Sequence, residues 1–96
     1  MSPAISDRGL QAIAALPKLA ELDISQTHVS DQGLKHIATL TGLTSLYMDD
    51  CGVTDVGLME LAKLKNLKEV WMFNTKVSNQ GTAILRQALP KCDIKR

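Results

Sequence analysis

The chain has 96 residues, of which 45% are hydrophobic, 22% charged and 3% aromatic, with a formal net charge of +1. This length predicts one globular domain spanning residues 1–96, and the balanced charge favours neither a nucleic-acid partner nor a membrane partner. No apolar run approaches the about 18 residues of a membrane-spanning helix, and the opening MSPAISDRGL is not the pattern of a signal peptide. Cys51 and Cys92 are too few for a disulfide framework, so we expect a reducing, cytoplasmic location.

The chain repeats itself every 24 residues, in rows 5–28, 29–52 and 53–76 and a shorter row 77–96. The rows align without a gap, and the same residue types recur at the same offsets. A hydrophobic residue opens each row (Ile5, Val29, Val53, Val77), and a glycine follows four positions later (Gly9, Gly33, Gly57, Gly81). Such a period predicts a solenoid, in which each row covers the apolar faces of its neighbours.

Within each row a helical period is followed by a strand period. In the second row Leu34, Ile37 and Leu40 recur at helical spacing after Ser30 and Asp31, which are residue types that favour helix starts. Residues 43–48 then switch to the alternation of a short strand. The third row repeats the arrangement, with Leu58, Leu61 and Leu64 after Thr54 and Asp55, so each row is predicted to form one helix and one strand.

The two ends of the array differ in polarity. The last row has Thr82, Arg86 and Lys91 in columns that are apolar in earlier rows, as expected of a capping repeat that meets water. The first row, by contrast, has fully apolar columns and only the four residues 1–4 before it. Two explanations stay open: the chain is the end of a longer array, which we favour, or its N-terminal edge pairs with another copy.

The strand segments LAELDISQTHV, LTSLYMDDCGV and LKEVWMFNTKV resemble the leucine-rich repeat consensus, with Thr27, Cys51 and Thr75 in its Asn/Cys column. The 24-residue rows look like the bacterial type found in many planctomycete proteins, and are also similar to the cysteine-containing repeats of F-box proteins. The resemblance implies an α/β horseshoe of about four strand–helix repeats, with a parallel sheet on the concave side and helices on the convex side. It also implies that Cys51 turns inward to bond loop backbone.

All three aromatic residues occupy outward positions of the predicted strands. Because alternate strand residues face opposite sides, Leu46, Met48, Val70 and Met72 point inward while Tyr47, Trp71 and Phe73 point outward. The same surface is rich in acids, chiefly Glu21, Asp23, Asp49 and Glu69, with Asp50 and Asp93 beside them and only Lys68 and Lys95 to balance them. Exposed aromatic clusters are typical of interaction sites, although aromatic residues also simply stabilise strands.

These features predict a non-enzymatic protein-interaction module. Its site would consist of Glu21, Asp23, Tyr47, Asp49, Glu69, Trp71 and Phe73, and its partner would be a basic protein or peptide. Two alternatives remain: a structural unit that self-associates through the N-terminal edge, and, from the resemblance, the substrate-recognition part of a ubiquitin-ligase adaptor. No acid, base and nucleophile converge in the sequence, and we expect no cofactor and no metal.

Other chemistry-bearing residues have structural interpretations. Asp7, Asp31 and Asp55 are predicted to start helices, and the repeated glycines to mark turns or close helix packing. Cys92 is expected to be partly exposed, and His28 and His36 to lie on the surface. Four lysines, Lys18, Lys63, Lys65 and Lys68, form a modest basic rim before the strands.

Overall fold

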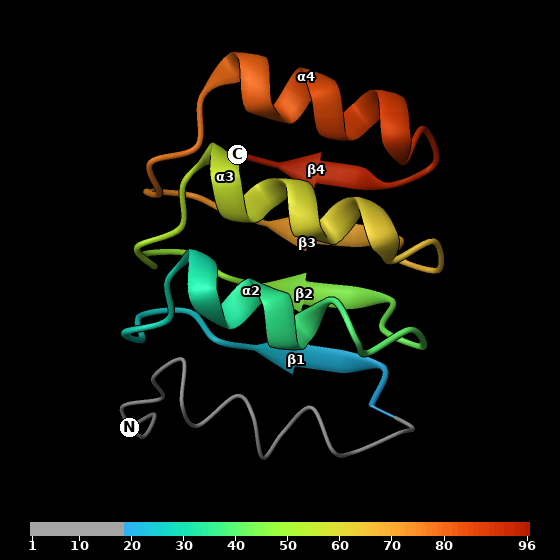
Figure 1. Cartoon of the computed structure of the whole chain (residues 1–96), viewed down its shortest axis with the longest axis horizontal. Coiled ribbons are helices and arrows are strands. Elements are labelled where there is room, and N and C mark those ends of the chain that lie inside the picture. The colour runs from blue at the N-terminus through green and yellow to red at the C-terminus, as the bar shows by residue number, and fades with distance from the viewer. Residues whose placement is uncertain (1–18) are drawn as a thin grey trace.

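The computed structural model describes residues 19–96, and these form a single four-stranded sheet with helices stacked beside it (Figure 1). The strands are β1 (Glu21–Asp23), β2 (Ser45–Tyr47), β3 (Glu69–Trp71) and β4 (Asp93–Lys95). The helices are α2 (Asp31–Ile37), α3 (Asp55–Leu58), the 3₁₀ helix η1 (Met59–Lys63) and α4 (Asn79–Ala88). The predictions for Asp7, Gly9 and Lys18 and for the N-terminal edge fall on residues outside this part of the chain.

The strands follow one another in chain order, and every neighbouring pair is parallel. Their register places Leu22 opposite Leu46, Leu46 opposite Val70 and Val70 opposite Ile94. Each partner lies one row further along the chain, so the row alignment read from the sequence is also the register of the sheet. The predicted α/β repeat solenoid is confirmed.

The core lies between the sheet and the helices and is built from the repeated apolar columns. The inward strand residues and the helix residues facing them are almost completely buried: Ile24, Leu46, Met48, Val70 and Met72 from the strand segments, and Leu34, Ile37, Leu58, Leu61 and Leu85 from the helices. Each row is too small to bury these side chains alone, so neighbouring rows stabilise one another by burying them together.

The spacing of the third row predicts a helix, but this segment is α-helical only at its start. It begins as α3 and continues from Met59 as the 3₁₀ helix η1. A 3₁₀ helix places residues three apart on the same side. Leu58, Leu61 and Leu64 therefore all enter the core, and none of them is exposed.

Aspartates at the helix starts join one row to the next. Asp31 accepts hydrogen bonds from the amide nitrogen and the hydroxyl group of Thr54, at 2.8 and 2.5 Å. Asp55 does the same one row later with Ser78, at 2.8 and 2.5 Å. The caps of α3 and α4 are the hydroxyl groups of Thr54 and Ser78, so Asp31 and Asp55 begin helices but bond across rows.

The repeated glycine makes room for this aspartate. A Cβ on Gly57 would lie 2.8 Å from Cα of Asp31, and a Cβ on Gly81 would lie 2.5 Å from Cγ of Asp55. Real Cβ atoms do not approach other atoms so closely, so a side chain at either position would force the neighbouring aspartate to move. The prediction of close helix packing at these glycines is confirmed, and the element they pack against is the aspartate of the preceding row.

In the last row, the side chain of Arg96 forms hydrogen bonds that other residues form in the earlier rows. The carbonyl oxygens of Val29 and Val53 accept from the amides of Gly52 and Lys76, the last residues of the same rows, each at 3.1 Å. The carbonyl of Val77 accepts instead from Nε of Arg96, at 3.2 Å, and Nη1 of Arg96 donates to Oδ1 of Asn79. The side chain of Arg96 thus supplies to Val77 and Asn79 the donors that Gly52 and Lys76 supply to Val29 and Val53, and that Thr54 and Ser78 supply to Asp31 and Asp55.

The polar residues of the last row are not all exposed. Arg86 and Lys91 are exposed, as expected of a cap. Thr82, however, is only 2% exposed, and its hydroxyl donates to the carbonyl of Asn79 at 2.9 Å. A threonine can enter the core column because this bond inside the first turn of α4 satisfies its hydroxyl group.

Candidate functional site

The face of the sheet turned away from the helices, hereafter the sheet face, displays the residues that alternate with the core. Tyr47 and Trp71 occupy adjacent places on β2 and β3, in the register column that begins with Asp23 and ends with Lys95. Both rings are half-buried, and Phe73, which follows β3, is 43% exposed. The structure therefore places the three aromatic side chains where strand alternation predicted.

The three aromatic rings form one continuous cluster. The ring centroids of Tyr47 and Trp71 are 6.2 Å apart with 33° between the planes, and those of Trp71 and Phe73 are 5.8 Å apart with 57° between the planes. Tilted contacts in this distance range are favourable because each ring edge meets the electron-rich face of its neighbour. The rings thus support one another as a single apolar surface across two strands.

Glu69 fixes two of these rings in place. Its Oε1 accepts a hydrogen bond from the indole Nε1 of Trp71 at 2.9 Å and another from the hydroxyl of Tyr47 at 3.3 Å. Burial raises the pKa of the Tyr47 hydroxyl, and the charge and hydrogen bond of Glu69, followed by the charge of Glu21, raise it further. Tyr47 consequently stays protonated at neutral pH and remains a donor to Glu69.

Most acids of the sheet face have no cation beside them. Lys95 forms an ion pair with Asp93 at 2.9 Å, and its Nζ lies 5.8 Å from the centre of the Trp71 ring. Within residues 19–96, Glu21, Asp23 and Glu69 form no ion pair; the two pairs there are Lys95–Asp93 and Lys63–Glu60. The sheet face therefore carries excess negative charge next to its aromatic cluster.

Two of the predicted acids also have structural tasks. Oδ1 of Asp49 accepts from the amide of Phe73 at 2.6 Å, which holds the start of the turn that carries the Phe73 ring. Oδ1 of Asp23 accepts from the amide of Ser25 at 2.9 Å, and the hydroxyl of Ser25 accepts from the amide of Asp49 at 3.0 Å. Asp49 thus joins the site partly by positioning Phe73, a role that its column position did not reveal.

The Asn/Cys column behaves as the resemblance implied. Sγ of Cys51 and the hydroxyl of Thr27 both donate to the carbonyl of Ile24, at 2.9 and 2.6 Å, and the hydroxyl of Thr75 donates to the carbonyl of Met72 at 2.9 Å. Burial raises the pKa of the Cys51 thiol. A buried, neutral thiol that bonds loop backbone has a structural role.

The expectation that Cys92 is partly exposed was wrong. Cys92 is only 9% exposed because the turn between α4 and β4 folds it inward, with its amide donating to the carbonyl of Leu89 at 3.0 Å. Burial raises its pKa to about 11. His28 is exposed and His36 is half-buried. Among residues 19–96, no group of three or more His, Cys, Asp or Glu side chains is arranged to hold a metal ion.

A family model described as Leucine Rich repeat matches residues 15–38 and 40–62. Together with the parallel sheet in row order, this match identifies the fold as a leucine-rich repeat solenoid. Repeats of this type generally mediate protein–protein interaction and are typically non-enzymatic. The search of curated proteins gave no match. None of the helices in residues 19–96 has the length and apolarity needed to cross a membrane.

Proposed function

We propose that this leucine-rich repeat solenoid binds a basic segment of another protein on its sheet face. The observation that supports the proposal most strongly is the continuous cluster of Tyr47, Trp71 and Phe73, bordered by carboxylates that have no counter-ion among residues 19–96. Aromatic side chains are the commonest anchors of protein interfaces, and negative charge around them selects a partner with lysine or arginine.

The arrangement of the rings favours tight binding because they need little reordering. Glu69 already bonds to Trp71 and Tyr47, and each ring already contacts a neighbour. Side chains that are held before binding lose less conformational freedom when the partner arrives, so more of the contact energy contributes to affinity.

Lys95 indicates what kind of group this surface accepts. Within the chain itself, an ammonium group lies near the face of Trp71 and bonds to a neighbouring carboxylate. A partner lysine or arginine placed over Tyr47 would find the same combination, with Glu69 and Glu21 as the carboxylates. Cation–π contacts of this type contribute about 0.5–2 kcal/mol.

The test begins with a random peptide library displayed to the wild-type protein. We expect the selected peptides to be enriched in lysine and arginine. The double variant Tyr47→Ala/Trp71→Ala should bind a selected peptide at least about tenfold more weakly. The matched control is Val56→Ala on α3, because Val56 is 76% exposed but lies among the helices.

Loss of affinity in the Val56 variant but not in the double variant would contradict the proposal, as would selection of acidic or uncharged peptides. Sedimentation over a wide concentration range addresses the self-association alternative. A dimer that persists in the Tyr47/Trp71 variant would favour assembly through another edge.

The finer family assignment is also a proposal. The 24-residue period and the cysteine at position 51 support placing the chain with the bacterial or cysteine-containing repeat types. The adaptor reading from that resemblance makes the same prediction for the sheet face, since substrate recognition would use the same aromatic and acidic residues.

A further inference from the structure

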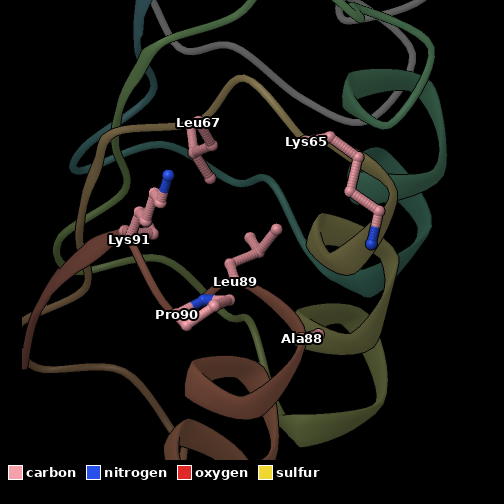
Figure 2. A pocket seen from close by; sticks show the side chains of 7 residues that line it. Lys65, Leu67, Ala88, Leu89, Pro90 and Lys91 are labelled. Atoms are coloured by element: carbon pink, nitrogen blue, oxygen red, sulfur yellow. The ribbon is translucent and has the colours of Figure 1, made fainter.

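A pocket of about 220 Å³ lies beside the C-terminal end of α4, near the residues that precede β3 and β4. Its lining includes the apolar side chains of Leu67, Ala88, Leu89 and Pro90. Figure 2 shows Leu67 and Leu89 directed toward the centre, with Lys65 and Lys91 on opposite sides of the opening. Lys65 belongs to the basic rim noted in the sequence, and the proposed function does not involve that rim.

The repeat pattern explains why the pocket is present here. Between the second and third rows, Nδ2 of Asn66 donates to the carbonyl of Thr41 at 2.9 Å and bridges the turns of these two rows. The equivalent position in the last row is Pro90, and the equivalent of Thr41 is Lys65. Proline has no amide group to donate, so this bridge cannot form between the last two rows, and the space beside Pro90 stays accessible.

The turns around the pocket are held by backbone bonds. The amide of Leu67 donates to the carbonyl of Leu64 at 3.1 Å, and the amide of Cys92 donates to the carbonyl of Leu89 at 3.0 Å. The apolar floor is therefore formed before any ligand arrives. Cys92, which also lines the pocket, contributes no charge at neutral pH because burial raises its pKa to about 11.

The charge of the pocket comes from its two lysines. Neither Lys65 nor Lys91 forms an ion pair within residues 19–96, where the two pairs involve Lys63 and Lys95. Both lysines are exposed, so their ammonium groups are accessible to a ligand. A small apolar recess between two unpaired cations is complementary to an apolar group with carboxylates on either side.

We propose that this pocket binds an acidic peptide segment of a partner protein, in which one leucine-sized side chain is flanked by aspartate or glutamate. The volume is below the about 300–1,000 Å³ of typical small-molecule sites, and so fits a single anchoring side chain. The pocket and the sheet face then recognise segments of opposite charge.

The experiment titrates ¹⁵N-labelled protein with the acetylated, amidated peptide Glu-Asp-Leu-Asp-Glu and follows the backbone amides. We expect saturable shifts centred on Lys65, Leu67, Leu89 and Lys91 that weaken with added salt. The peptide with serine in place of leucine, and the peptide with lysine in place of its four acids, should bind at least about tenfold more weakly.

Two variants test the apolar recess and the two lysines separately. Pro90→Asn restores the bridging amide without changing any charge, so it should close the pocket and reduce affinity at least about tenfold. Lys65→Gln/Lys91→Gln leaves the recess intact and should reduce both the affinity and its salt dependence. Lys35→Gln on α2 is the matched control, because Lys35 is exposed and far from the pocket lining, and should bind like wild type.

The proposal is overturned if no shift occurs up to about 10 mM peptide, if the shifts lie on the sheet face, or if neither variant weakens binding. Shifts of the pocket amides with protein concentration alone would assign the pocket to a second copy of the chain and overturn it as well. Because the sheet face is tested by a basic peptide and different variants, failure here leaves the proposed function untouched.

Discussion

Replacing Gly57 by alanine tests how the rows are joined. Alanine favours a helix over glycine by about 1 kcal/mol, so propensity alone predicts a small gain in stability. The structure predicts a loss, because the new Cβ would lie 2.8 Å from Cα of Asp31, a backbone atom that moves only with its row. Overpacking of this kind costs about 1–3 kcal/mol.

The clash also reaches the Asp31 carboxylate, which Thr54 holds with two hydrogen bonds at 2.8 and 2.5 Å. Disturbing a hydrogen bond to a charged group costs about 1.5–3 kcal/mol. The expected net effect of Gly57→Ala is therefore a loss of about 3 kcal/mol in the free energy of unfolding, measured by urea denaturation followed by circular dichroism.

Gly42 provides the matched control, since nothing lies within 4 Å of a Cβ added there. Gly42→Ala should change stability by less than about 1 kcal/mol. A free energy of unfolding of Gly57→Ala equal to that of wild type or of Gly42→Ala would contradict the predicted clash with Asp31.

A second glycine separates side-chain from backbone obstruction. The atoms that a Cβ on Gly81 would meet all belong to the Asp55 side chain, whereas Gly57 also faces backbone. Asp55→Ala should therefore relieve most of the penalty of Gly81→Ala, while Asp31→Ala should relieve only part of the penalty of Gly57→Ala. Equal relief in both pairs would show that the aspartate side chain alone sets the spacing of the rows.

Three further predictions concern the last rows. Arg96→Ala should lower the free energy of unfolding by about 1 kcal/mol, measured by urea denaturation, because the carbonyl of Val77 loses its donor; unchanged stability would contradict this. Burial raises the pKa of Cys92 in the folded state to about 11 from an ordinary 9.0, so the stability that the neutral thiol contributes should be fully present below pH 9 and be lost as pH rises toward 11. Cys92→Ala should flatten this alkaline decline in the free energy of unfolding. An unchanged slope of that free energy against pH would contradict the prediction. Hydrogen bonds from Ser78 lower the pKa of Asp55 in the folded state. The stability that the Asp55 carboxylate contributes should therefore be present above its ordinary pKa of 3.8 and be lost as pH falls through the lower folded-state value. Asp55→Asn should reduce this acid dependence in denaturation curves at low pH, and a curve identical to that of wild type would contradict the prediction.

The sequence was sufficient to predict the fold because each row repeats the same pattern of apolar positions. Leu22, Leu46 and Val70 occupy one column, and a column of inward residues is also the register of a parallel sheet. Strand alternation then determined that Tyr47 and Trp71 face outward, since neither could enter the core without displacing its neighbours.

Contacts that depend on the direction of one side chain could not be predicted in this way. An aspartate at a helix start can cap its own helix or reach a neighbouring element, and only the distance between rows decides that Asp31 bonds to Thr54. The bridging position of Glu69 between Trp71 and Tyr47 likewise depends on its rotamer. Cys92 is buried because of the path of one turn, which its column did not specify.

The pocket beside Pro90 did have a signal in the sequence. Of Gly42, Asn66 and Pro90, which share a column, only Asn66 has a side chain that can donate a hydrogen bond, and a lysine adjoins each of the last two, Lys65 beside Asn66 and Lys91 beside Pro90. This pattern predicts a pocket only together with the structure, which shows that Asn66 donates to the carbonyl of Thr41 in the preceding row. Variable columns in a repeat therefore identify places where neighbouring rows can differ in their contacts.

The indole N–H of Trp71 reports directly on whether the sheet face is the surface that binds the partner. Trp71 is the single tryptophan of the chain, so its indole gives one isolated resonance, from a group that donates to Glu69 at 2.9 Å. During titration with a library-selected basic peptide, we predict that this resonance shifts and saturates along the same binding curve as the affected backbone amides. A peptide that binds while the indole resonance stays unmoved would contradict it.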